Sequence, residues 1–150
     1  MKMKTTGYLL LFALFVMFLA GTSPVASEST GILIVNINGF PSSEGFAMVA
    51  LHDSKESYKG EAAAAIAKTQ IKVIDQKAQA IFGNMAYGGY GVSIFHDKNA
   101  NGKMDKNAMG IPKEAYGFSN NAKGFFGKPD YKKVVFQLNS AEKQIAINLD

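Results

Sequence analysis

Residues 90–96, Tyr-Gly-Val-Ser-Ile-Phe-His, decide the fold class of this chain. Apolar side chains recur at every second position, and Val92, Ile94 and then His96 fall on one side. This period of two is typical of a half-buried β-strand, because successive side chains of a strand point to opposite faces of the sheet. The stretch therefore predicts a strand with one face in a hydrophobic core.

Similar short segments lie on both sides of this strand, separated by Gly, Asn and Pro. Two of them, 70–74 and 78–82, predict a hairpin, and the last two predict a closing pair. Only the alanine-rich stretch 61–68 favours a short helix. Strands are expected at residues 32–38, 46–52, 70–74, 78–82, 90–96, 133–138 and 144–149. This pattern predicts an all-β fold, an antiparallel two-sheet β-sandwich of about seven strands.

The N-terminus has the pattern of a secretory signal peptide. Lys2 and Lys4 supply positive charge, residues 8–20 form an uncharged apolar run, and the small residues at 25–27 predict cleavage before Glu28. A run of roughly 13 apolar residues is shorter than the ~20 that cross a bilayer, which argues against a retained anchor. We therefore expect a signal peptide at 1–27 and one domain at 28–150, exported to the periplasm or secreted, with no membrane span after cleavage.

The composition excludes several function classes. All 16 basic residues are lysine, and the net charge of +4 falls to about +2 when Lys2 and Lys4 leave with the signal peptide. Proteins that bind nucleic acid normally carry a basic stripe with arginines, so we expect no nucleic-acid partner. The chain has no cysteine, which excludes a disulfide framework, thiol chemistry and a lipoprotein-type anchor.

The segment that follows the strand at 90–96 resembles an ion-binding loop. Residues 97–105, Asp-Lys-Asn-Ala-Asn-Gly-Lys-Met-Asp, match the first nine positions of an EF-hand calcium loop. In such a loop, oxygen side chains at alternate positions surround the ion, a glycine permits the turn, and the seventh residue offers its carbonyl. The predicted ligands are Asp97, Asn99, Asn101, the carbonyl of Lys103, and Asp105, with Gly102 at the turn.

The loop departs from the pattern at its twelfth position, where Ala108 replaces the bidentate glutamate. A complete site then needs an oxygen from elsewhere, and Glu114 is the nearest carboxylate downstream. With so few acids the predicted Ca²⁺ site is weak, with a Kd of about 10⁻⁴ to 10⁻³ M.

Two other interpretations of this region remain open. Asn101-Gly102 is also a hairpin-turn signal, and Asp and Asn side chains readily bond to their own backbone in loops without a metal. Alternatively, residues 45–53 echo residues 89–97, and both copies end in His-Asp. A transition-metal site formed by His52, His96 and the aspartates after them would require these two strand ends to lie together.

The run from Phe95 to Asn121, which contains Asn99-x-Asn101-Gly102-x-x-Asp105 and Gly110-Ile111-Pro112-Lys113-Glu114, resembles the uncharacterised bacterial family called domain of unknown function 2141. The resemblance covers about residues 31–149. It implies export and a β-sandwich related to transthyretin-like and carboxypeptidase-regulatory domains, but no established activity. The chain departs from the family at residues 86–90, where a proline usually precedes the glycine and tyrosine.

Residues 106–131 form a long connection rich in Gly, Asn and Lys, and its aromatic residues are Tyr116, Phe118, Phe125, Phe126 and Tyr131. Long irregular loops in small domains are often functional. The rings predict either a ligand surface, for example for stacking on sugars, or a cap over the end of the fold.

The sequence contains no recognisable catalytic motif. Ser119 has no GxSxG surroundings, and no HExxH pair is present. We therefore expect a binding or structural module of the cell envelope rather than an enzyme, with an unidentified envelope or extracellular ligand. The alternatives are a metal-free β-sandwich that binds carbohydrate or another small ligand and, last in rank, a hydrolase.

Overall fold

Strands account for most of the ordered elements in the structure, a computed structural model that describes residues 29–60, 64–125 and 127–150. In chain order the elements are β1 (Thr30–Asn38), β2 (Phe46–His52), α1 (Lys55–Lys59), β3 (Ala67–Lys72), β4 (Ala78–Ala86), β5 (Gly88–Asp97), β6 (Tyr116–Phe118), the 3₁₀ turn η2 (Ser119–Asn121), α2 (Tyr131–Val134), β7 (Phe136–Leu138) and β8 (Glu142–Asn148). The mainly β fold is therefore confirmed. The predicted signal peptide, residues 61–63 and Phe126 lie outside the described residues.

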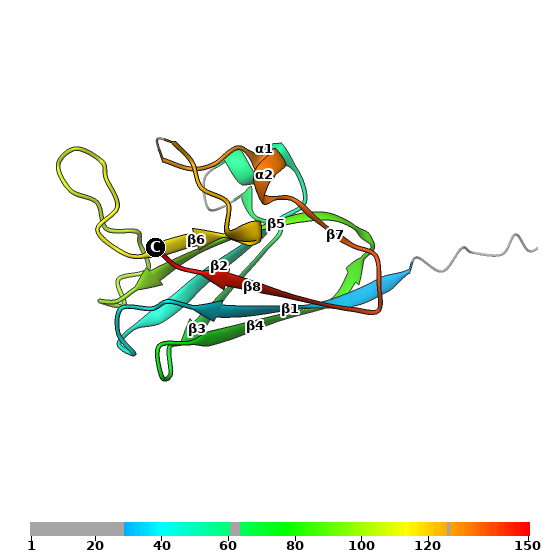
Figure 1. Cartoon of the computed structure of the whole chain (residues 1–150), viewed down its shortest axis with the longest axis horizontal. Helices are drawn as coiled ribbons and strands as arrows, with labels where there is room; N and C mark the ends of the chain where they lie inside the picture. The colour runs from blue at the N-terminus through cyan, green and yellow to red at the C-terminus, as the bar shows by residue number, and fades with distance from the viewer. Residues whose placement is uncertain (1–28, 61–63, 126) are drawn as a thin grey trace, which may run out of the picture.

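The strands form two sheets (Figure 1). One has the order β4-β1-β8, and the other has the order β3-β2-β5-β6, with β7 also paired to β5. We call the second one the large sheet. Every strand pair within it is antiparallel.

Both sheets contribute to one hydrophobic core. In β1, the alternating residues Leu33, Val35 and Ile37 are at most 1% exposed. Alternating residues of β2, β5 and β8 join them in the same cluster. Full burial of each such aliphatic side chain stabilises the fold by about 1.5–3 kcal/mol, so this shared core holds the two sheets together.

The predicted face of β5 is confirmed, and it includes a buried histidine. Val92, Ile94 and His96 are all buried on the core side. The His96 ring packs edge-on against Phe40 with centroids 5.1 Å apart, and its Nε2 lies 2.7 Å from the main-chain oxygen of Glu44. Because a carbonyl can only accept, Nε2 carries the proton and donates it. His96 is thus a core histidine with its hydrogen bond satisfied.

One strand pair contradicts the antiparallel prediction. β1 and β8 run parallel, with Ile32 opposite Glu142 and Asn38 opposite Asn148. The prediction that segments 133–138 and 144–149 pair with each other is also wrong, because β7 pairs with β5 and β8 pairs with β1. The short link between β7 and β8 crosses from one sheet to the other, so each strand buries its apolar residues in the shared core from a different side.

The predicted hairpin at 70–74 and 78–82 is wrong for a similar reason. Asp75 and Gln76 form the expected tight turn, with φ of 49° and 58°, and a single bridge joins Ile74 to Lys77. Beyond that bridge the strands diverge, because β3 pairs with β2 and β4 pairs with β1. The turn chemistry is that of a hairpin, but the chain changes sheets at this point.

The predicted helix at 61–68 is wrong where the structure describes it, since Ala67 and Lys68 belong to β3. The helix in this connection is α1, which comes earlier. Ser54 caps α1, because its Oγ accepts the Ser57 N–H at 3.1 Å. Such a cap stabilises a short helix by roughly 1 kcal/mol.

The outer face of the large sheet is partly covered near α1 and α2 (Figure 1). A second core cluster forms here from Tyr58, Phe118 and Val134. Gly91 permits the close approach of α2, since a Cβ there would lie 3.0 Å from side-chain atoms of Tyr131 and Val134. The rest of this outer face stays open and holds the site described next.

The helices of the described residues are short. Within 29–60, 64–125 and 127–150, none is long and apolar enough to cross a membrane.

Candidate functional site

Asp97 is the residue around which the predicted calcium loop folds. It ends β5 and is fully buried, at 0% exposed. Its Oδ1 accepts the N–H of Asn101 at 3.0 Å and its Oδ2 accepts the N–H of Gly102 at 2.8 Å. Gly102 has φ of +76°, in the left-handed region that glycine adopts without steric cost. The first carboxylate of the motif therefore closes the turn.

The side chains of Asn99, Asn101 and Asp105 meet above this turn. The Nδ2 groups of Asn99 and Asn101 donate to the two carboxylate oxygens of Asp105 at 2.7 and 3.1 Å. The Oδ1 of Asn99 accepts the N–H of Asn101 at 3.2 Å, and the Oδ1 of Asn101 accepts the N–H of Lys103 at 2.8 Å. The alternate side chains of the loop thus converge, as their spacing predicts.

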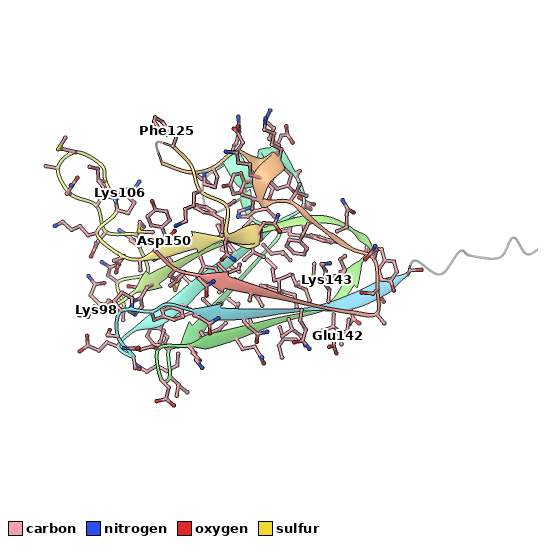
Figure 2. The ribbon with its side chains drawn as sticks, viewed as in Figure 1. Lys98, Lys106, Phe125, Glu142, Lys143 and Asp150 are labelled. Atoms are coloured by element: carbon pink, nitrogen blue, oxygen red, sulfur yellow. The ribbon has the colours of Figure 1, made fainter. Side chains whose placement is uncertain are left out.

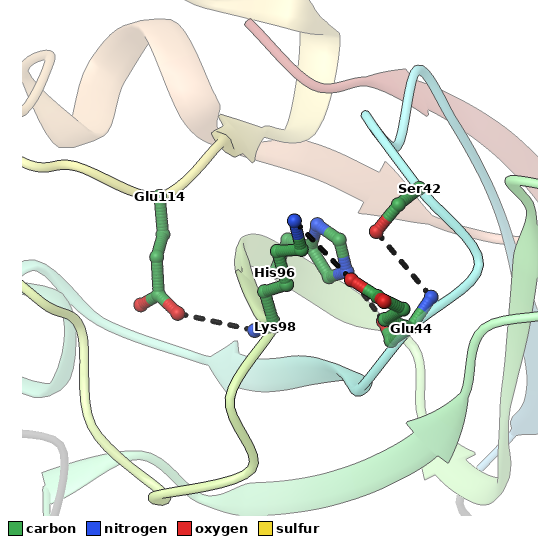
Figure 3. A network of polar contacts seen from close by, with 5 residues as sticks. All are labelled: Ser42, Glu44, His96, Lys98 and Glu114. Atoms are coloured by element: carbon green, nitrogen blue, oxygen red, sulfur yellow. Dashed lines mark hydrogen bonds and ion pairs between the residues drawn. The ribbon is translucent and has the colours of Figure 1, made fainter.

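Glu114 joins the two ends of the loop. Its carboxylate accepts the Lys98 N–H at 3.1 Å, as Figure 3 shows, and the Asp105 N–H at 2.9 Å. Lys98 also forms an exposed ion pair with Glu44 at 3.2 Å. Each oxygen of Glu114 therefore holds a backbone N–H at one end of the segment 98–105.

The oxygen atoms of this loop are of the kind that a hard cation prefers. Ca²⁺ takes six to eight oxygen ligands, and the loop offers two carboxylates, two amide oxygens, the Lys103 carbonyl and the nearby Glu114. A carboxylate oxygen that accepts an N–H keeps a further lone pair for an ion. In the structure the side-chain amides of Asn99 and Asn101 point their nitrogen atoms toward Asp105. An ion would bind in place of these N–H groups once the amides rotate so that their oxygen atoms face it.

A groove lies beside the loop, on the open outer face of the large sheet, with a volume of about 840 Å³. Its floor consists of outward-facing side chains from successive strands, among them Met48 of β2, Phe95 of β5 and Tyr116 of β6. Met104 of the loop at 97–105 and Pro112, which follows it, form one wall. The volume and mixed lining are typical of small-molecule sites.

His52 and Ser93 form a hydrogen-bonded pair in this groove. His52 is 3% exposed, and its Nδ1 lies 3.1 Å from the main-chain oxygen of Ser57. That oxygen can only accept, so in the neutral ring Nδ1 carries the proton and Nε2 is the acceptor. The Ser93 hydroxyl, 2.9 Å away, therefore donates to Nε2. A nucleophilic serine needs the same three parts: hydroxyl, base and orienting acceptor.

The groove is lined by lysines and by no acid among the described residues. Its cationic groups are Lys68, Lys106 and Lys128. The Nζ of Lys128 lies 3.8 Å from the centroid of the Tyr58 ring and donates to the Tyr58 carbonyl. Burial lowers the pKa of Lys128. Figure 2 shows Lys106 on a loop that projects from the same side of the molecule as the loop of Phe125.

The electrostatic surroundings keep His52 neutral. Burial lowers the pKa of His52 below 6.5, and the positive charge of Lys128 lowers it further. The Ser57 carbonyl and Asp53 act in the opposite direction with less effect. At neutral pH the ring is thus the unprotonated form that accepts the Ser93 proton.

Comparison with known proteins places this chain in a family. A family model named DUF2141, described as an uncharacterized protein conserved in bacteria, matches residues 35–146. The chain is a member of the DUF2141 family. The resemblance carried by residues 95–121 is therefore confirmed. Neither a curated protein nor a solved structure matches the chain in the same comparisons. The matched range of DUF2141 includes the loop at 97–105 and the His52–Ser93 pair.

The transition-metal interpretation is wrong for this DUF2141 chain. His52 lies opposite Gly91 and His96 lies opposite Ala47, so antiparallel pairing places the two His-Asp ends at opposite ends of β2 and β5. In the described part of the chain, no group of three or more His, Cys, Asp or Glu side chains is arranged to hold a metal ion. A calcium site here would depend on the amide and main-chain oxygens as well.

The aromatic residues of the long connection divide into two sets. Phe118 is buried in the second core cluster, and Tyr116 and Tyr131 pack against it. These three rings cover part of the outer face of the large sheet, and not the end of the fold that one of the two interpretations predicts. Tyr116 and Phe118 also line the groove. Phe125 is 94% exposed.

Proposed function

We propose that this DUF2141 protein is an exported binding module that holds a small, partly apolar ligand in the groove, and that Ca²⁺ stabilises the loop at 97–105. In the same proposal the two sheets form a sandwich of the transthyretin-like or carboxypeptidase-regulatory type. The observation that carries the binding function is the groove of about 840 Å³ on the outer face of the large sheet.

The side chains of the floor support this function. Met48, Phe95 and Tyr116 are neither fully buried nor fully exposed, so they present apolar surface at the bottom of a concavity. A ligand that covers this surface gains about 25 cal/mol for each Å² of apolar area removed from water.

The connection between loop and groove supports the role of calcium. Gly102 and Met104 belong to the predicted ion-binding loop and also line the groove. An ion held by Asp97 and Asp105 would therefore fix the position of this wall. Calcium would act on ligand binding through geometry, without touching the ligand.

Binding of a neutral apolar dye, N-phenyl-1-naphthylamine, tests the proposed function. We expect a saturable rise in dye fluorescence with one site per chain. Phe95→Asp should weaken binding by at least about tenfold, because a carboxylate on the floor must lose its hydration when the dye binds. The matched control is Ile81→Asp, since Ile81 is 62% exposed on β4 in the other sheet. Equal loss of binding in both variants, or no saturable binding, would contradict the proposal.

Ester hydrolysis is a second candidate function, favoured by the Ser93–His52 hydrogen bond of 2.9 Å. Ser93 Oγ would attack the ester carbonyl as its proton moves to His52 Nε2, and the leaving alcohol would take that proton. Water would then hydrolyse the acyl-serine and release the acid.

The hydrolase candidate is tested with a fluorophosphonate probe and p-nitrophenyl butyrate. Covalent labelling of Ser93, together with turnover that is lost in Ser93→Ala and kept in Ser140→Ala, is the expected result. If mass spectrometry finds no label on Ser93, the candidate is excluded and the pair is a cross-strand structural contact.

A further inference from the structure

We infer that the ligand of the groove is a single-chain amphiphile with an anionic head group, namely a long-chain carboxylate. This inference rests on the proposed function and names the class of ligand that the groove accepts.

The lining fits an alkyl chain. Met48 and Phe95 on the floor, Met104 and Pro112 on the wall and Tyr116 at β6 form apolar surface on more than one side. Methionine side chains are unbranched and polarisable, and they adapt to a flexible chain better than to a rigid planar ligand. The cavity of about 840 Å³ lies within the range of small-molecule pockets, about 300–1,000 Å³.

The charges of the groove select the head group. Lys68 comes from β3, Lys106 from the loop and Lys128 from the segment before α2, so positive charge reaches the groove from three directions. No acidic residue is among the described residues that line it, although the whole chain carries 12 acids against 16 lysines. The exposed Lys68 and Lys106 can keep their stems on apolar surface and their ammonium groups in water, whereas the Lys128 ammonium group donates to the Tyr58 carbonyl at the edge of the groove. This arrangement complements a ligand with an apolar chain and a solvated anion.

The neutral polar residues of the groove agree with the same ligand. Gln70 of β3 and the His52–Ser93 pair supply hydrogen-bonding groups without negative charge. Among the described residues of the lining, a cationic amphiphile would meet charged groups of its own sign, and like-charge contacts disfavour the wrong partner.

Displacement of N-phenyl-1-naphthylamine by three amphiphiles of equal chain length tests this inference. The probes are dodecanoate, dodecanol and dodecyltrimethylammonium, each used below the concentration at which it aggregates. We expect dodecanoate to displace the dye at concentrations at least about tenfold lower than the other two, and added salt to reduce the difference.

A double variant separates charge from shape. Lys68→Gln/Lys106→Gln should lose most of the preference for dodecanoate over dodecanol, measured for each protein relative to its own affinity for the neutral dye. Lys55→Gln/Lys77→Gln, which removes two exposed lysines outside the groove, is the matched control and should keep the preference.

The outcomes distinguish a failure of the proposed binding function from a failure of the inference about the anionic head group. If the dye does not bind, the groove function itself fails. If the dye binds but the three amphiphiles displace it equally, or the double variant keeps the preference, the inference about the anion is overturned. Sedimentation with phosphatidylglycerol vesicles, without displacement by free dodecanoate, would overturn it in favour of a membrane surface.

Discussion

His52 and His96 lie at the C-terminal ends of two neighbouring strands and are each followed by an aspartate, yet they have different surroundings. His96 faces the core and donates to the Glu44 carbonyl at 2.7 Å. His52 faces the groove, where its ring packs edge-on against Tyr58 with centroids 5.4 Å apart. The face of the sheet on which each ring lies decides its role.

Protonation of His52 should destabilise the protein. Burial and the charge of Lys128 lower its pKa in the folded state, whereas the unfolded chain keeps the ordinary value of 6.5. Between these two values the unfolded state binds more protons, so the free energy of unfolding falls as the pH drops below about 6.5. Urea unfolding between about pH 7.5 and about pH 5.5 should show this loss in the wild type.

A His52→Gln variant should lose less stability over the same interval, because it lacks the titrating ring. Lys128→Gln should reduce the loss in part, since one of the two causes of the lowered pKa is gone. An unchanged pH dependence in His52→Gln would show that the loss comes from another group.

At the scale of the element, the loop at 97–105 gives a prediction about stability. If Ca²⁺ binds the folded loop, calcium at about ten times the Kd should add about 1.4 kcal/mol to the free energy of unfolding. Thermal melts in EDTA and in millimolar calcium should then differ by roughly 3–6 °C. Asp105→Asn should abolish the difference, because it removes the charge that an ion would neutralise.

Asp75→Asn is the matched control for this experiment. Asp75 is an exposed aspartate in the turn between β3 and β4, so its loss should leave the calcium effect intact. An equal shift in the wild type and Asp105→Asn, or no shift in the wild type at several millimolar calcium, would contradict the prediction. The loop would then be the metal-free turn whose hydrogen bonds the structure shows.

The sequence predicts the strands of this fold better than their partners. The period of two locates β2 at its observed bounds, and it assigns Val92 and Ile94 of β5 to the core. Partner choice depends on contacts between distant segments, which periodicity does not contain. The turn at Asp75 has hairpin geometry, so nothing local distinguishes a change of sheet from a hairpin. The parallel pairing of β8 with β1 has no local signal at all.

The same difference between local spacing and long-range pairing decides which parts of the candidate site the sequence predicts. The convergence of Asn99, Asn101 and Asp105 follows from spacing within one loop, and the sequence predicts it. The His52–Ser93 pair depends on the register between β2 and β5, which places Ser93 opposite Ala50. From the sequence alone, one can infer that His52 and Ser93 both occupy outward positions of their strands. This inference does not determine the register between the two strands, and most registers would keep the two side chains apart.

At the scale of the whole molecule, the remaining prediction concerns export. We expect cells to release a mature chain that begins at Glu28. N-terminal sequencing or intact-mass measurement of the protein from the periplasm or culture medium checks this. Replacing two leucines of residues 8–20 by arginine should keep the full-length chain in the cytoplasm, because a charged run is not inserted as a signal peptide. A cytoplasmic wild-type protein that retains Met1 would contradict the prediction.

The arrangement of β1 has a consequence for folding. Both of its neighbours, β4 and β8, come later in the chain. Wherever the chain folds, β8 is the last strand of this sheet to become available, so one edge of β1 stays unpaired until Glu142–Asn148 arrive. An unpaired apolar strand is a template for other chains. Chains that lack Glu142–Asn148 would therefore leave this edge of β1 unpaired and prone to associate with other chains.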